Sequence, residues 1–210
     1  MYIHPKHRFF LFASFTSGVD AANILAKLGL NSDGVPYSPD LPNFIGCFTR
    51  VGGLKQTTEI KEWKTGCMEE TTKEMGITRF DNITADEGVS PAKDLLYRLY
   101  VHNGSVQFNL HIVVLDNEGN ESIMFVAKDG WVKSFNSGDL DATSQDPYVQ
   151  SVEIPHGGLI TYRINKVDPA DRATWVWQYY DGVTKTWVDE PDVTLAPNAY
   201  TTLGIDAFKI

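Results

Sequence analysis

The sequence predicts a mainly β protein with one flanking α-helix at about residues 91–102 and a small β appendage at its C-terminal end. Residues 105–128 alternate between apolar and polar side chains on both sides of a "DNEG" turn, as a hairpin does. A single clear helix pattern stands among many such strands. Its 210 residues, 42% of them hydrophobic, suffice for one sizeable core.

The first predicted strand is "HRFFLFASF" at residues 7–15, which is aromatic and expected to be buried. The same region imitates a signal peptide, but its apolar run is short and interrupted by Ser14 and Thr16. We therefore expect no signal peptide. Residues 17–43 are predicted as an inserted loop that carries one or two helical turns.

Two strands are predicted around Gly52 and Gly53, and the second, "KQTTEIKEW", leaves almost nothing to bury. The polar segment 64–76 lacks strand alternation and is predicted as a long loop. Residues 77–84, "ITRFDNIT", are predicted as the next strand. A strand with so little to bury raises the question of what covers its polar face.

The helix is predicted from its start and stop signals. Ser90 can cap the helix, Pro91 suits its first position, and Gly104 follows its end. Apolar side chains at helical spacing predict that one side packs on a sheet: Leu95, Leu96, Leu99 and Tyr100.

In the following hairpin one face is predicted to be apolar and the other to be polar but uncharged. The apolar face is Val106, Phe108, Leu110, Ile112 and Val114, and the polar face is Gln107, Asn109 and His111. Residues 146–164 predict two more strands. We expect a main domain at residues 1–165 and a hairpin extension at 166–210, centred on "YDGVTK".

The extension holds four aromatic side chains whose spacing suggests one surface: Trp175, Trp177, Tyr179 and Trp187. A docking surface on the main domain, or the small core of the extension itself, is the preferred interpretation. A sugar-stacking platform is the alternative. It leads to a different class of function, a monomeric carbohydrate-binding β-sandwich.

The sequence offers no catalytic constellation. The histidines lack metal-ligand spacing, and no nucleophile, phosphate-binding or zinc motif occurs, so we expect no enzyme activity, metal or cofactor. A net charge of -9 argues against a basic face that reads nucleic acid. Cys47 and Cys67 could pair, but reduced thiols are preferred. No apolar stretch is long enough to span a bilayer.

Read in order, the segments resemble the tail-tube protein family of contractile phages and phage-like contractile injection systems. The family pattern "GF..VSGL", "TE..EY..GG" and "G.TKY.NITL..G" is matched by "GCFTRVGGLKQTTEIKEWKTG" and "GITRFDNITADEG". The helix, "VQFNLHIVVLDNEGN" and the segment from "KDGWVKSF" to "VEIPHGGL" follow in the family order. Order and spacing agree from His4 to about Ile164.

Three departures from the family pattern concern the subfamily. The insertion after the first strand is longer than usual, Asp86 and Glu87 stand where the family has basic residues, and about forty-five residues follow the family's usual end. They leave the general role unchanged.

The resemblance implies a β-barrel or sandwich with a flanking helix, assembled as hexameric rings that stack into a hollow tube for DNA or effector cargo. Strand edges would then be paired by neighbours, and polar strand faces would line a wet lumen. The implied lumen-facing residues are Glu59, Lys61, Asp86, Glu87, Gln107, Asn109 and His111. The implied ring-stacking residues are Lys64, Glu69, Glu70, Lys73 and Glu74.

The implied partners are further copies of the chain together with sheath and baseplate proteins. Cargo would pass without specific binding, and no membrane is involved. The implied location is a virion tail or a cytoplasmically assembled injection particle. A tube initiator or baseplate protein of the same fold is the near alternative.

Overall fold

The computed structural model describes residues 9–15, 43–64, 66, 71–89, 93–102, 106–136, 150–190 and 197–207, and it confirms a mainly β chain. The strands are β1 (Phe9–Ser14), β2 (Asn43–Gly52), β3 (Gln56–Trp63), β4 (Thr72–Phe80), β5 (Ile83–Val89), β6 (Phe108–Leu115), β7 (Glu121–Gly130), β8 (Ser134–Asn136), β9 (Gln150–Ile154), β10 (Gly158–Lys166), β11 (Trp175–Asp181) and β12 (Thr186–Asp189). The helices are α2 (Lys93–Val101), α3 (Pro197–Ala207) and the short 3-10 helix η1 (Arg172–Thr174). The predicted insertion at residues 17–43 lies outside the described residues, apart from Asn43.

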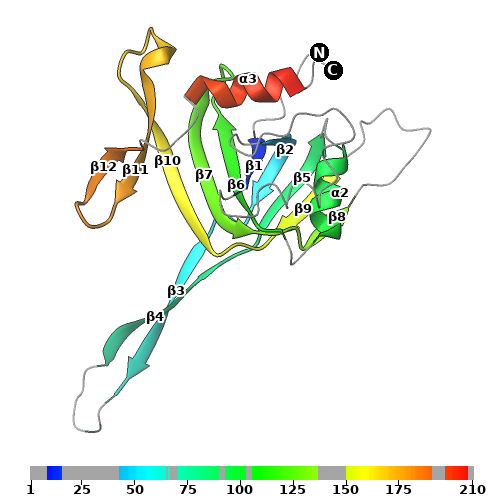
Figure 1. The fold of residues 1–210 in the computed structure, drawn as a ribbon. Coiled ribbons are helices and arrows are strands. Elements are labelled where there is room, and N and C mark those ends of the chain that lie inside the picture. Colours follow the sequence, from blue (N-terminus) through cyan, green and yellow to red (C-terminus); the bar gives the residue numbers. More distant parts are fainter. Residues whose placement is uncertain are drawn as a thin grey trace.

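Ten strands form one antiparallel sheet in the order β12-β11-β10-β7-β6-β1-β2-β5-β9-β8 (Figure 1). The sheet turns a corner where β7 leads into β8 and β9 leads into β10. There the Trp131 backbone N–H donates to the Pro155 carbonyl at 3.3 Å, and the Gly157 N–H donates to the Lys128 carbonyl at 2.8 Å. The two halves of the sheet enclose a core between them, but within this chain the sheet is not closed into a barrel.

The first core cluster lies between the two halves of the sheet and beneath α2. It joins residues of β1, β2, β5, β6 and β9 to Leu95, Leu96 and Leu99 of the helix. The predicted packing of α2 is therefore confirmed for these three leucines. It is wrong for Tyr100, which is 41% exposed, because its position on the helix turns it away from the sheet.

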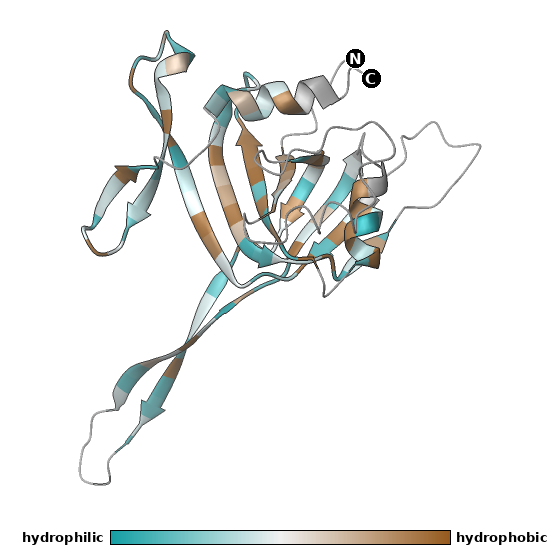
Figure 2. Ribbon diagram, in the orientation of Figure 1, coloured by the Kyte–Doolittle hydropathy of each residue, from teal (hydrophilic) through white to brown (hydrophobic). Residues whose placement is uncertain are grey.

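The second core cluster occupies the opposite face of the same central strands. It is rich in aromatic side chains, with Phe10 and Phe12 of β1, Phe44 of β2 and Trp177 of β11. Tyr200 of α3 is part of it, so α3 covers this face. The central strands are thus buried on both sides, and Figure 2 shows hydrophobic colouring concentrated on them.

The C-terminal extension differs from the prediction in two respects. First, β11 pairs with β10 over Trp175–Tyr179, so the predicted hairpin is present but continues the main sheet. Second, the chain has a further helix, α3, where only β structure was predicted. The fold class and the flanking helix α2 are confirmed, and α3 is a second helix that was not predicted, because it derives its stability from a face of the sheet that sequence spacing does not reveal.

Strands β3 and β4 form a two-stranded arm that projects from the body (Figure 1). The prediction of a loop over residues 64–76 is wrong at its end, since β4 begins at Thr72 and includes Lys73, Glu74 and Met75. The strand predicted at residues 77–84 is two strands, interrupted at Asp81 and Asn82. That interruption separates the arm from β5 in the body of the molecule.

The β6–β7 hairpin is confirmed, with its turn between Leu115 and Glu121. The Asp116 side chain holds the turn by accepting hydrogen bonds from the backbone N–H groups of Glu118 and Asn120 at 2.8 and 2.9 Å. A register shift follows between Val114 and Leu115. This bulge places Glu121 opposite Leu115, on the face that α3 covers.

Candidate assembly surfaces

The arm is the surface with the largest excess of exposed apolar side chains. Every residue of β3 is exposed, and Ile60 lies opposite Met75, which is 85% exposed. Trp63 and Ile77 are exposed as well. A two-stranded ribbon is marginally stable alone in water, and its free edges leave backbone groups unpaired. The arm therefore has the properties of an element that another chain covers.

The charges of the arm are paired across its two strands. Glu59 contacts Arg79 at 2.9 Å and Glu62 contacts Lys73 at 3.0 Å, while the Thr58 and Thr78 hydroxyls lie 2.9 Å apart. Such exposed ion pairs add little stability. They hold the two strands in register. The apolar side chains of the arm remain exposed to water.

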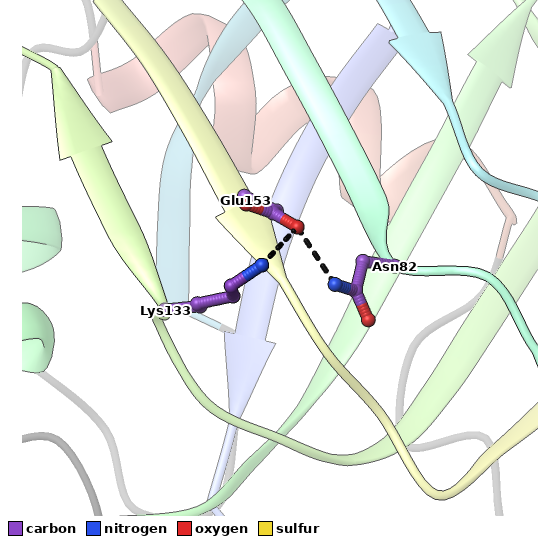
Figure 3. A network of polar contacts seen from close by, with 3 residues as sticks. All are labelled: Asn82, Lys133 and Glu153. Atoms are coloured by element: carbon purple, nitrogen blue, oxygen red, sulfur yellow. Dashed lines mark hydrogen bonds and ion pairs between the residues drawn. The ribbon is translucent and has the colours of Figure 1, made fainter.

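The base of the arm is attached to the body by a polar network (Figure 3). One oxygen of Glu153 on β9 accepts hydrogen bonds from the Asn82 side-chain amide at 2.7 Å and from the Lys133 ammonium at 2.8 Å. The hydrogen bond from Lys133, followed by that from Asn82, lowers the pKa of Glu153. The carboxylate thus stays ionised and joins β9 to the segments before β5 and β8.

Gly53 allows the chain to leave the body for the arm. Its φ of +79° lies in the left-handed region, and a Cβ there would come within 1.8 Å of the Asn82 carbonyl oxygen. Glycine is therefore required at this position, where the segment that enters the arm passes close to the segment that returns from it.

The predicted ring-stacking residues are placed only in part. Lys64 is exposed directly after β3, whereas Lys73 and Glu74 lie on β4 instead of in a loop. Glu69 and Glu70 lie outside the described residues. The three described residues of the set thus belong to the outer end of one arm.

The predicted lumen residues fall into three places. Glu59 and Lys61 lie on the arm; Asp86 and Glu87 lie on β5, where Glu87 accepts a hydrogen bond from the Thr49 hydroxyl at 2.6 Å. Gln107 is exposed, and Asn109 is half-buried and accepts a hydrogen bond from the Asp129 N–H at 3.3 Å.

His111 does not lie on an open face, because α3 covers it. The expectation that this strand face needs no cover is corrected for that residue.

His111 is held between β1 and α3. Its Nε2 lies 2.7 Å from the Ser14 hydroxyl, and its Nδ1 lies 3.2 Å from the Tyr200 hydroxyl. Burial lowers the pKa of the imidazole to about 4, so it is neutral at pH 7. Burial also raises the pKa of the Tyr200 phenol. Sequence reasoning missed this contact, since Ser14, His111 and Tyr200 are far apart in the chain.

Glu121 is the second polar contact of α3. Its side chain is almost fully buried, and Oε1 accepts a hydrogen bond from the Thr201 N–H at 2.8 Å in the first turns of the helix. Burial raises the pKa of this carboxyl, although the Thr201 hydrogen bond acts in the opposite direction. The bulge in β7 is the feature that brings a glutamate to this position.

The four aromatic side chains of the extension do not form one platform. Trp175 and Trp177 are buried and point to the same side of β11, and Trp177 packs in the second core cluster. Trp187 pairs with Tyr180 on the other side, where the Arg163 guanidinium lies 3.9 Å from its ring centroid. A continuous sugar-stacking surface of these four rings is therefore not formed.

Neither metal chemistry nor membrane crossing is indicated by the described residues. Among them, no group of three or more His, Cys, Asp or Glu side chains could hold a metal ion. No helix among these residues combines the length and apolar character that crossing a bilayer requires. Cys47 is buried as a free thiol, and burial raises its pKa, while Cys67 lies outside the described residues.

Comparison with known proteins agrees with the fold. The family model of the T4-like virus tail tube protein gp19 matches residues 42–160. A chain of the cryo-EM structure of an extracellular contractile injection system, the PVC sheath-tube complex in its extended state, is 20% identical with a TM-score of 0.51, covering 77% of this chain and 93% of that one. A chain of the anti-feeding prophage baseplate structure is 18% identical with a TM-score of 0.52, covering 74% and 92%. A search of curated proteins gave no match.

Proposed function

The chain belongs to the T4-like virus tail tube protein family, and from this membership we propose that it is the structural protomer of a hollow tube built from stacked hexameric rings. The two structural neighbours are tube-containing and baseplate assemblies of injection systems, and at 18–20% identity they support the fold alone. The proposed role is conduit formation without catalysis. Sheath and baseplate proteins are the proposed partners beyond the chain itself.

The single observation that carries the proposal is the arm. Its apolar side chains have no covering element among the described residues, and its two strands pair only with each other. In a ring or stack of rings, neighbouring protomers would cover these side chains and satisfy the free edges. Heterologous contacts of this kind close into rings when the rotation between protomers fits.

The proposed lumen residues suit transit of cargo. Asp86 and Glu87 are acidic, Glu59 is paired with Arg79, Lys61 is basic, and the chain as a whole carries a net charge of -9. A wall with this charge repels phosphate groups, so DNA would pass without being held at strong sites. The proposed location is accordingly a phage tail or an injection particle assembled in the cytoplasm.

A tube initiator or baseplate protein of the same fold is the second candidate. The observation that favours it is the C-terminal extension, because β11, β12 and α3 all follow the last residue of the family match at 160. This segment adds strands to one edge of the sheet and a helix to one face. Such additions suit a protein that must bind something other than identical copies.

The experiment is negative-stain electron microscopy across a concentration series, with mass measurement alongside. Six-fold rings or tubes are expected for the main tube protomer. A discrete ring that never stacks would favour the initiator. A persistent monomer at all concentrations would contradict the tube proposal, and sugar-dependent quenching of tryptophan fluorescence would then test the carbohydrate-binding alternative.

The double variant Ile60→Glu with Met75→Glu tests the arm directly. It places two carboxylates opposite each other on the exposed apolar side, so we expect loss of rings with an unchanged folded monomer. Val183→Glu is the matched control, because Val183 is 90% exposed in the β11–β12 turn. Equal assembly by the arm variant would show that the arm is not an assembly surface.

A further inference from the structure

Among the described side chains of helix α3, Tyr200 reaches deepest into the sheet. Tyr200 is buried, and its ring centroid lies 5.1 Å from that of Phe12, 6.3 Å from that of Trp177 and 6.0 Å from that of His111. Leu203 packs against the same cluster. The helix is therefore a cover over an aromatic face, and its removal would expose Phe12, Phe44 and Trp177.

The polar contacts of this cover involve two titratable groups of the sheet. His111 on β6 contacts the Tyr200 hydroxyl on one side and the Ser14 hydroxyl of β1 on the other. Glu121 on β7 accepts a hydrogen bond from the Thr201 N–H. The two contacts are made by consecutive helix residues, Tyr200 and Thr201. A change of charge at His111 or Glu121 therefore acts directly on the docking of α3.

The other titratable groups around this contact come from four elements. Cys47 of β2 and Tyr162 of β10 belong to the cluster, and Tyr179 of β11 packs against it. Glu190 after β12 accepts a hydrogen bond from the Tyr162 hydroxyl at 3.4 Å. The pKa of Tyr162 is raised to about 12, and burial raises the pKa values of Cys47 and Tyr200. None of these three groups gains or loses a proton between pH 7 and pH 4. Titration of the docked helix in that range therefore falls to His111 and the carboxyl groups.

We propose that α3 is an acid-sensitive cover, which leaves the sheet when His111 is protonated while the sheet itself stays folded. Both hydroxyls beside the imidazole can accept hydrogen bonds, so protonation need not break these contacts by geometry alone. The cost comes from placing a positive charge between Phe12, which lies opposite His111 on β1, and the Tyr200 ring, in a site where burial disfavours the charged imidazole. Undocking of α3 returns the imidazolium to water without disturbing the strand ladder.

The direction of the pH dependence follows from the lowered pKa of His111. The docked imidazole has a pKa of about 4 against 6.5 for the free group, so docking is favoured above pH 6.5 and weakens as the pH falls through this interval. His111 alone would raise the open fraction of α3 by up to about 100-fold between pH 7 and pH 4. Glu121 acts in the opposite direction, since its raised pKa means that protonation favours the docked state.

The test is amide hydrogen exchange of the full chain at pH 7.5, 5.0 and 4.0, corrected for the intrinsic exchange rate. We expect protection of α3 to fall at least 10-fold from pH 7.5 to 4.0, while β6 and β7 remain protected. In His111→Gln the loss of α3 protection in acid should disappear, and protection should instead stay level or rise because only the opposing Glu121 remains. His156→Gln is the matched control, because His156 contacts the Gly158 carbonyl away from α3, and it should respond like the unmodified chain.

Two results would overturn the proposal. Protection of α3 that is equal at pH 7.5 and 4.0 would show that protonation does not open it. Simultaneous loss of protection in α3 and in β6–β7 would show global unfolding instead of undocking. Either result is read from the unmodified chain, so the decision stands even if His111→Gln fails to fold. Glu121→Gln should keep the acid response and enlarge it, because the opposing carboxyl is gone.

Discussion

At the scale of single residues, the fold depends on a few positions where a side chain is either required or excluded. Gly88 on β5 lies against the ring of Phe48, and a Cβ there would come within 2.1 Å of that ring. Gly53 is required by its left-handed backbone at the base of the arm. Glu153 gathers Asn82 and Lys133 around one carboxylate oxygen. These residues position the arm relative to the core.

Gly88→Ala is expected to lower the free energy of unfolding by about 1–3 kcal/mol, because fully buried Phe48 has no room to move aside. Chemical denaturation measures the change. Gly182→Ala is the matched control, since nothing lies within 4 Å of its added Cβ. Equal stability of Gly88→Ala and the unmodified chain would show that this strand tolerates displacement.

Glu153→Gln is expected to loosen the base of the arm at pH 7 and to remove a pH dependence. The lowered pKa of Glu153 means that its contribution to stability is present above the ordinary pKa and is lost as the pH falls through the lowered value. Denaturation midpoints between pH 6 and pH 3 should therefore fall less steeply for the variant. Glu62→Gln, in an ion pair out on the arm, is the control and should retain the slope.

At the scale of elements, the central strands are covered twice, by α2 on one face and by α3 on the other. The α2 contact uses three leucines at helical spacing. Among the described side chains of α3, Tyr200 and Leu203 pack on the sheet, and two hydrogen bonds join the helix to it. We therefore expect α3 to be the less firmly held of the two helices.

Truncation of Tyr200 should separate the packing and hydrogen-bond parts of this contact. Tyr200→Ala removes the buried ring, and we expect α3 docking to weaken by about 3 kcal/mol or to be lost. Tyr200→Phe removes the hydroxyl beside His111, with an expected cost of about 1 kcal/mol. The free energy of opening from amide exchange in α3 measures both. A larger cost for Tyr200→Phe would mean that the hydrogen bond, not the packing, holds the helix.

At the scale of the whole molecule, the chain divides into a body with a covered core and an arm with exposed apolar side chains on both strands. The chain shares its fold with the structural neighbours, and the C-terminal extension lies beyond the family match. Assembly is thus expected to depend on the arm. Any property that distinguishes this chain from other members of the family is expected to depend on the extension.

Charge reversal in the segment that follows β3 in the sequence is expected to impair ring stacking without unfolding the monomer. Glu69→Lys with Glu70→Lys changes the net charge of the segment by four, so contacts with an oppositely charged partner surface would become repulsive. Tube length by electron microscopy at low and high salt is the measurement, and salt should reduce the difference. Long tubes of normal appearance from this variant at low salt would contradict the stacking role of Glu69 and Glu70.

The sequence alone determined most of the elements and the family. Local signals sufficed for the aromatic strand β1, the β6–β7 hairpin and the leucine face of α2, because alternation, turn residues and helical spacing are short-range properties. The ordered series of segments sufficed for the family. The mostly polar strand β3 already indicated an element with little to bury inside its own chain.

Tertiary structure decided the rest. Only the fold showed that β11 extends the main sheet, that α3 covers its aromatic face, and that Ser14, His111 and Tyr200 meet. Strand register determines the bulge that turns Glu121 toward α3. It also determines on which side of the sheet Trp177 and Trp187 lie. Register is set by pairing between distant segments, and a one-residue shift moves a side chain to the opposite face, so no local pattern could fix it.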